Sequence, residues 1–191
     1  MISPKIAVIN CGSKHIQNIY DILLRYNCIT NEVLLENSSL FPFHMVNAII
    51  ISGGPHLFTD PITQDTLSKH FSFINQLNLP ILGICLGHQA LGISHGVMAY
   101  KGTTRCSKEL IKIEKSHALL KDISASAIFQ ADHCEGIPLP NGFELLGSSE
   151  YYPVEIMAHI IKPFYGVQFH PEISGENGNI LIKNFIELIN Q

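Results

Sequence analysis

A reactive thiol is predicted at Cys85, which has a glycine two residues away on either side, at Gly83 and Gly87. An apolar run precedes this segment and a helical pattern follows it. A strand, a tight turn and a helix with these glycines are typical of a nucleophile elbow, where bulky flanking side chains would collide. The nucleophile then projects from the end of the sheet at a helix N-terminus, whose dipole favours a thiolate. A lone cysteine is more often structural, but this context favours a nucleophile.

A base and an orienting group for such a thiol are present in His170-Pro171-Glu172. Proline disfavours the helical conformation of the residue before it, so we expect an extended segment. Side chains two residues apart in an extended segment point the same way, so Glu172 can hold the imidazole of His170. Ten histidines offer many chance His–Glu pairs. Together with the elbow, however, this pair predicts a Cys85–His170–Glu172 triad.

Backbone amides that could bind an oxyanion lie near the predicted nucleophile. The amide of Leu86 follows the thiol directly, and Gly53-Gly54-Pro55 follows a predicted buried strand. Open α/β sheets bind ligands at this end of their strands. We therefore expect an oxyanion hole there, although a plain flexible loop is the alternative for the glycines.

Asp132-His133-Cys134-Glu135 is a second cluster of chemically active side chains. Adjacent residues of a strand or turn point in different directions, which disfavours a shared metal ion. We predict a substrate-lining loop and no metal site. The five cysteines include no Cys-x-x-Cys pair, so neither a zinc ribbon nor a disulfide framework is expected. Residues 101–115 carry five basic side chains, which predicts a solvated pair of strands and not a nucleic-acid surface.

The elements that must position these residues alternate between strand and helix in the first half of the chain. Short apolar, β-branched runs predict strands at 5–10, 32–35, 46–52 and 80–84. Apolar residues at helical spacing predict helices at 15–26, 63–77 and 86–96. Ser13 is placed to cap the first of these helices. Near-continuous apolar strands between helices indicate a parallel sheet covered on both faces.

The second half of the chain is β-rich and ends in a helix. Strands are predicted at 110–114, 127–131, 144–148, 154–160 and 164–169, and the helix at 178–189. No repeat, low-complexity tract or domain boundary is visible, so we expect a single domain over residues 1–191. The predicted fold is α/β, with an open, mostly parallel sheet flanked by helices and an additional β-rich segment.

The composition agrees with a compact enzyme-sized domain. Of the 191 residues 46% are apolar and 15% are charged, and the net charge is −4 with no long block of either sign. This balance gives no electrostatic case for nucleic acid or an anionic membrane. The apolar run at 6–9 is too short for a signal peptide, and no run is long enough to span a membrane. We therefore expect a cytoplasmic protein.

Three segments resemble the signatures of class I, triad-type glutamine amidotransferases. They are Gly-Ile-Cys-Leu-Gly-His-Gln at 83–89, Ser-Gly-Gly-Pro at 52–55 and Gly-Val-Gln-Phe-His-Pro-Glu at 166–172. They occur in the family's order, and the resemblance covers nearly the whole chain. It implies a flavodoxin-like fold and the hydrolysis of glutamine to glutamate and ammonia through a thioester on Cys85. His170 would shuttle the proton, and Glu172 would orient it.

The same resemblance implies roles for the residues around the triad. The amides of Gly54 and Leu86 would form the oxyanion hole. The residues that would hold the substrate glutamine are Gly53, Gln89, Asp132 and His133. The family needs no metal or cofactor for this step, so none is expected in this chain.

Within the family, the chain is most similar to the glutaminase subunit of two-subunit GMP synthases. The likeness rests on Asn-Gly-Phe-Glu-Leu-Leu at 141–146 and Pro-Val-Glu-Ile-Met-Ala-His at 153–159. It implies that ammonia passes to an ATP-dependent synthetase subunit that makes GMP from XMP. ATP and Mg²⁺ are expected in that partner only, since this chain has no Gly-rich nucleotide-phosphate loop.

Other functions stay open because residues 10–14, 131–135 and 173–178 depart from the pattern of the GMP synthase type. The chain would then serve another synthase, such as anthranilate or aminodeoxychorismate synthase, or a specialised pathway. A stand-alone hydrolase of γ-glutamyl amides is a rival enzyme that needs no partner. A non-catalytic binding module is a rival of another class, and the complete triad argues against it.

Overall fold

A mixed sheet runs through the middle of the computed structural model, which describes residues 3–189. Within these residues nine strands form the sheet, in the order β2-β1-β3-β4-β11-β10-β9-β6-β7. The first five of them pair in parallel. They are β2 (Ile29–Leu34), β1 (Lys5–Asn10), β3 (Ala48–Ile51), β4 (Ile81–Ile84) and β11 (Phe164–Val167). The mostly parallel α/β fold predicted from the sequence is therefore confirmed.

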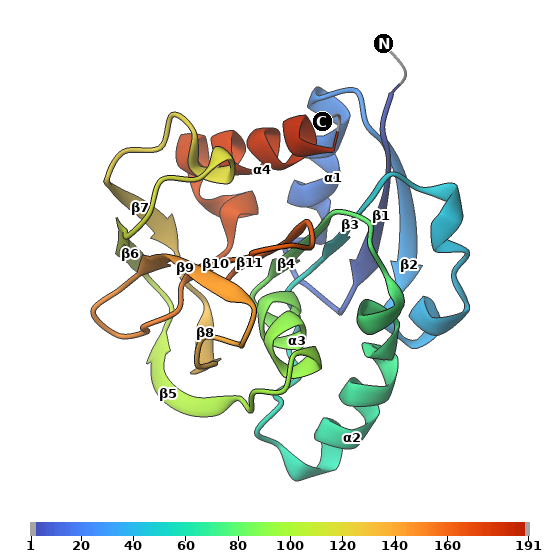
Figure 1. Cartoon of the computed structure of the whole chain (residues 1–191), viewed down its shortest axis with the longest axis horizontal. Coiled ribbons are helices and arrows are strands. Elements are labelled where there is room, and N and C mark those ends of the chain that lie inside the picture. The colour runs from blue at the N-terminus through green and yellow to red at the C-terminus, as the bar shows by residue number, and fades with distance from the viewer. Residues whose placement is uncertain (1–2, 190–191) are drawn as a thin grey trace.

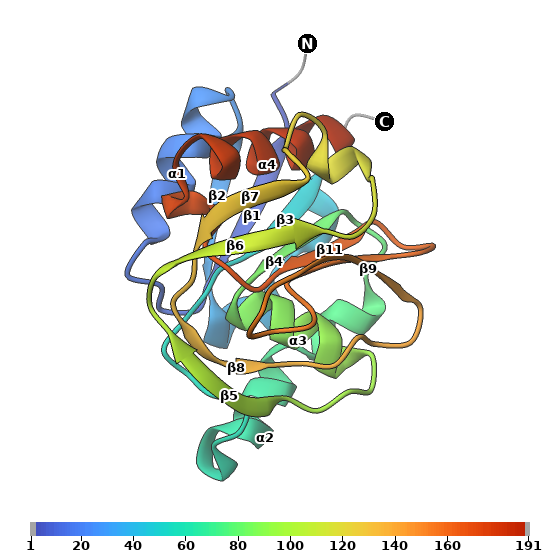
Figure 2. The same cartoon turned by 90° about the vertical axis from the view of Figure 1, so that its left-hand side faces the viewer.

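The β-rich second half extends this sheet with antiparallel strands. These are β10 (Ile156–His159), β9 (Phe143–Ser148), β6 (Lys108–Ile113) and β7 (Ser126–Gln130). Two further strands, β5 (Tyr100–Arg105) and β8 (His133–Gly136), form a separate antiparallel ribbon below the sheet (Figure 2). Residues 101–115 do contain two strands, but β5 and β6 pair with other strands and not with each other. The predicted strand pair is wrong in its partners.

Helices cover both faces of the parallel half (Figure 1). The helices α1 (Ile16–Arg25) and α4 (Gly175–Leu188) pack on one face, and α2 (Pro61–His70) and α3 (Leu86–Ser94) on the other. Successive strand residues alternate between the two cores, which is why the strands read as continuous apolar runs. For example, Ile6 and Val8 belong to the core under α1 and α4, whereas Ala7 and Ile9 face α2. None of the helices within residues 3–189 is long and apolar enough to cross a membrane.

The helix boundaries differ from the sequence predictions at two places. Ser13 is not the cap of α1, because His15 occupies the N-cap position and Ser13 Oγ instead accepts a hydrogen bond from the His15 amide. The predicted helix at 63–77 begins earlier, where Asp60 caps α2, and it ends at His70. A tighter 3₁₀ turn, Ser72–Gln76, then keeps the apolar stripe buried. Further 3₁₀ turns are Leu35–Leu40, Phe43–Met45, Ala118–Leu120 and Pro171–Ile173.

Candidate active site

Cys85 occupies a strained turn between β4 and α3. Its backbone has φ 49° and ψ −102°, a region that L-residues rarely adopt and that costs about 1–3 kcal/mol. A Cβ atom on Gly83 would lie 2.4 Å from the carbonyl oxygen of Gly87. A Cβ atom on Gly87 would lie equally close, 2.4 Å, to the carbonyl oxygen of Ile51. The tight turn expected from the sequence is present, and β3 as well as the turn itself requires its glycines.

The backbone of β11 fixes the position of this turn. Gly83 and Ile84 of β4 pair in parallel with Gly166 and Val167 of β11. The amide of Cys85 continues this ladder, because it donates to the Val167 carbonyl at 2.9 Å. The strand that leads to His170 is therefore joined by hydrogen bonds to the strand that ends in the thiol.

His170 and Glu172 form a buried pair, with 2.7 Å between His170 Nδ1 and Glu172 Oε1. His170 is extended, as expected, but Pro171–Ile173 forms a 3₁₀ turn. The side chains therefore meet across a tight turn, and the extended geometry expected for Glu172 is wrong. The amide of His170 donates to the Gln130 carbonyl at 2.8 Å, which ties the imidazole segment to the end of β7.

Gly53 lies between the thiol and the imidazole. A Cβ atom at this position would be 2.7 Å from Cε1 of His170 and 3.4 Å from Cβ of Cys85. Burial alone would lower the pKa of His170, but its hydrogen bonds with Cys85 and Glu172 outweigh burial and raise that pKa above its usual value. The surroundings of His170 therefore favour an imidazolium, the form that can pair with a thiolate.

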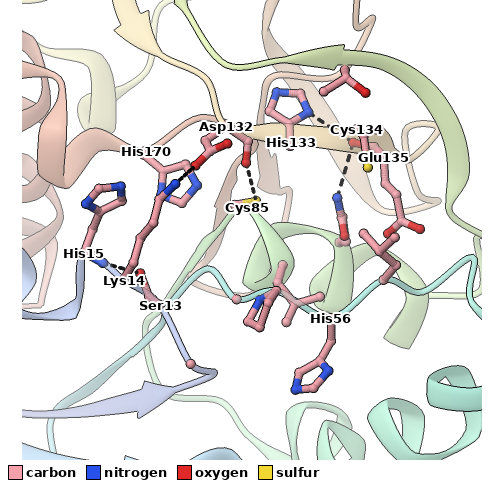
Figure 3. A pocket seen from close by; sticks show the side chains of 17 residues that line it. Ser13, Lys14, His15, His56, Cys85, Asp132, His133, Cys134, Glu135 and His170 are labelled. Atoms are coloured by element: carbon pink, nitrogen blue, oxygen red, sulfur yellow. Dashed lines mark hydrogen bonds and ion pairs between the residues drawn. The ribbon is translucent and has the colours of Figure 1, made fainter.

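A cavity of about 340 Å³ opens beside Cys85 (Figure 3), a volume suited to a small molecule. Its floor comes from the carboxyl ends of β1, β3 and β4, and β8 supplies one wall. The lining residues are Gly12, Ser13, Lys14, His15, Gly54, Pro55, His56, Leu57, Cys85, Leu86, Gln89, Thr104, Asp132, His133, Cys134, Glu135 and His170.

The residues expected to bind an oxyanion or the substrate are mostly in this lining. Gly54 and Leu86 both face the cavity, and Leu86 is the first residue of α3, where a helix leaves its amide without an internal partner. Gln89 also lines the cavity, and its Nε2 donates to the Glu135 carbonyl at 3.3 Å. Gly53 is buried and absent from the lining, so the geometry gives it a packing position behind the triad.

Asp132 and His133 stand on the wall opposite the helix. The carbonyl of Asp132 is 3.9 Å from the Cys85 thiol, and its carboxylate forms a 2.5 Å ion pair with Lys14 (Figure 3). Burial lowers the pKa of His133 to about 4, so its ring is neutral. Residues from His133 to Glu135 belong to β8, so the loop predicted there is in fact a strand.

Two contributors to the site were not identified from the sequence. Glu135 is buried, and its carboxylate accepts hydrogen bonds from the amides of Phe58 and Thr59, at 3.0 and 2.7 Å, and from the Thr59 hydroxyl. It thereby ties the loop after β3 to β8. Lys14 follows β1, and its place after a parallel strand is the signal that could have identified it. Within residues 3–189 no group of three or more His, Cys, Asp or Glu side chains is arranged to hold a metal ion.

A buried carboxylate lies behind the cavity wall at Glu155. Its carbonyl accepts from the amide of Gln168 at 2.8 Å, and Gln168 in turn accepts from Gln89 at 3.4 Å. Burial raises the pKa of Glu155 from 4.5 to about 7, partly offset by a hydrogen bond from Ser149. Polar groups thus continue from the cavity into the core.

Comparison with known proteins agrees with this geometry. The model of the family "Glutamine amidotransferase class-I" matches residues 7–188. The glutamine-hydrolyzing subunit of GMP synthase from Methanosarcina barkeri is 35% identical over 145 residues, which cover 74% of this chain and 73% of that protein. The subunit of the same name from Methanocaldococcus jannaschii is 30% identical over 189 residues, which cover 96% of each chain.

Solved structures show the same fold. A protein from Thermoplasma acidophilum superposes with a TM-score of 0.90 at 24% identity, covering 100% of this chain and 96% of that one. A glutamine amidotransferase from Thermotoga maritima superposes with a TM-score of 0.80 at 18% identity, covering 100% of this chain and 84% of that one.

Proposed function

This chain belongs to the class-I glutamine amidotransferase family, and we propose that it hydrolyses glutamine to glutamate and ammonia with Cys85 as the nucleophile. One observation carries this proposal: the strained turn presents a thiol beside the buried His170–Glu172 pair, at the wall of a cavity of suitable size. A thiol, a base and an orienting carboxylate are the parts that nucleophilic attack on an amide requires.

The reaction follows from the positions of these groups. The Cys85 thiolate attacks the side-chain carbonyl carbon of glutamine, and the amides of Gly54 and Leu86 stabilise the oxyanion. The imidazolium of His170 gives its proton to the departing nitrogen, so ammonia leaves and a glutamyl thioester remains. His170 then takes a proton from water, and the resulting attack breaks the C–S bond to release glutamate. Glu172 keeps the imidazole oriented and stabilises its positive charge throughout.

The destination of the ammonia is proposed from the relatives. Two that cover most of this chain are named as the glutamine-hydrolyzing subunit of GMP synthase. We therefore propose that this chain passes ammonia to an ATP-dependent synthetase subunit that converts XMP to GMP. ATP and Mg²⁺ would be bound by that partner.

The test is a reconstitution with the synthetase subunit from the same organism. XMP, ATP, Mg²⁺ and glutamine should yield GMP only when both proteins are present, and glutamine hydrolysis should increase on mixing. With Cys85→Ser, ammonium should still support synthesis while glutamine should not. Steady hydrolysis by the isolated chain, unchanged by the synthetase, would instead identify a stand-alone hydrolase.

A further inference from the structure

An ion pair between Lys14 and Asp132 lies at the wall of the catalytic cavity. Lys14 Nζ is 2.5 Å from Asp132 Oδ2, and both residues line the cavity (Figure 3). Lys14 belongs to the connection between β1 and α1, whereas Asp132 immediately precedes β8. The pair therefore joins two segments that are far apart in the sequence and meet at the mouth of the site.

The neighbours of this pair hold it close to the reacting groups. The backbone carbonyl of Asp132 is 3.9 Å from the Cys85 thiol. The ring of His15, the residue after Lys14, packs edge-on against His170 with 5.9 Å between ring centroids. The ion pair is thus one residue removed from contacts with both the thiol and the imidazole.

The other charged side chain in the cavity lining is already used. Apart from the histidines, the lining includes only Lys14, Asp132 and Glu135 as ionisable acids and bases with full charges at neutral pH. The carboxylate of Glu135 is occupied by the backbone and hydroxyl of the loop after β3. Within the described cavity, Lys14 and Asp132 are therefore the pair of opposite charges that a zwitterion can address.

We infer that Lys14 and Asp132 bind the amino-acid head group of the substrate, an inference that rests on the proposed glutamine hydrolysis. Lys14 receives the α-carboxylate, and Asp132 receives the α-ammonium group. In glutamine three carbon–carbon bonds separate the attacked carbonyl carbon from the α-carbon. A substrate bound to Cys85 must therefore place its head group a few ångströms from the thiol, which is where the ion pair lies.

The exchange of one ion pair for two substrate contacts is favourable because the pair is open to solvent. The Lys14 side chain is 67% exposed and that of Asp132 is 29% exposed. Exposed ion pairs are weakly held, so little is lost when the zwitterion inserts and each residue gains a new opposite charge. The consequence is specificity for free glutamine over amides whose α-carboxylate is blocked.

The test compares how two reagents alkylate Cys85 in Lys14→Met and in a matched control. The first reagent is a diazoketone analogue of L-glutamine, 6-diazo-5-oxo-L-norleucine, and the second is iodoacetamide, which has no head group. The control is Lys112→Met, because Lys112 pairs with Glu114 at 3.0 Å with exposures of 69% and 29%, nearly those of the Lys14 pair, but outside the cavity. Mass spectrometry of the labelled peptide gives both rates.

We expect Lys14→Met to slow labelling by the glutamine analogue on the order of 10- to 100-fold, the effect of losing one charge-assisted hydrogen bond. Its reaction with iodoacetamide should stay at the wild-type rate, and Lys112→Met should resemble wild type with both reagents. Lys14→Arg, which keeps the charge, should recover most of the loss.

Equal slowing by both reagents, or no change with the analogue, would overturn the head-group role of Lys14. The first result would mean that Lys14 acts on the thiol, and the second that it acts on neither. Failure of the proposed hydrolysis has a different signature. The analogue would then label the wild type no more selectively than it labels Cys85→Ser.

Discussion

Glu172 Oε1 lies 2.7 Å from His170 Nδ1 even though a 3₁₀ turn, and not an extended strand, joins the two residues. The turn begins at Pro171, whose fixed φ suits the first position of a helical turn. Two neighbouring positions are therefore held in different conformations by one proline. The result is a carboxylate that faces the imidazole with almost no exposure of its side chain to solvent.

Replacing this carboxylate by an amide should impair catalysis without removing the fold. Glu172→Gln keeps the shape of the side chain but removes the charge that stabilises the imidazolium, so the pKa of His170 should decrease. We expect kcat for glutamine hydrolysis to drop by at least about 100-fold. Glu176→Gln, at an exposed position on α4, should behave as wild type. Equal activity of the two variants in a coupled glutamate assay would contradict an orienting role for Glu172.

The strain at Cys85 predicts an unusual stability order. Glycine adopts positive φ without penalty, so Cys85→Gly should be more stable than Cys85→Ala by about 1 kcal/mol. Cys28 provides the control because it is buried, yet it is not among the described residues with positive φ. At Cys28 the order should reverse, with alanine more stable than glycine. Urea unfolding of the four variants measures both differences, and the same order at both positions would show that the turn stores no strain.

The buried carboxylate of Glu155 should make stability depend on pH. Its pKa is about 7 in the folded protein against 4.5 for the ordinary group. Between these values the unfolded chain releases a proton that the folded chain retains, so the unfolding free energy should decrease as pH rises from about 4.5 to 7. Above pH 7 the penalty is constant at roughly 3 kcal/mol.

Glu155→Gln removes this penalty and should therefore stabilise the protein more at pH 8 than at pH 5. Glu150→Gln, at an exposed position, is the control and should show little change at either pH. Thermal unfolding at the two pH values measures the effect. A Glu155→Gln variant whose gain is the same at both would refute the proposed proton uptake.

Glu135 should stabilise the loop after β3. Glu135→Ala leaves the amides of Phe58 and Thr59 without their acceptor, at a cost of about 2–4 kcal/mol in unfolding free energy. Glu135→Gln keeps one acceptor oxygen and should lose less. Glu187→Ala, in an exposed pair with Lys183 on α4, should change the urea midpoint little. An effect of Glu135→Ala as small as that of Glu187→Ala would mean that these hydrogen bonds add no net stability.

The parallel half of the fold could be predicted because its signals are local. Buried strands such as β1 and β4 are short apolar runs followed by glycine or turn residues, and α3 begins directly after the elbow. The thiol, base and carboxylate were also identified, since glycine spacing and a proline restrict the backbone within a few residues.

The features that were missed depend on contacts between distant segments. The strands β5 and β8 have no apolar run of their own, and their pairing, for example Tyr100 with Gly136, is determined by tertiary structure. The ion pair of Lys14 with Asp132 likewise requires both loops to be placed first. The end of α2 at His70 was missed because a 3₁₀ turn continues the same apolar stripe.

The hydrogen bond from the Cys85 amide to the Val167 carbonyl has a consequence for how a partner could control this site. The strands that lead to the nucleophile and to the base share one ladder, so their separation cannot change unless the centre of the sheet shears. A docking protein has no such obstacle at the connection after β1 or at the loop that Glu135 ties down. We therefore expect activation to proceed by rearranging the walls around a rigid catalytic pair, and not by assembling that pair.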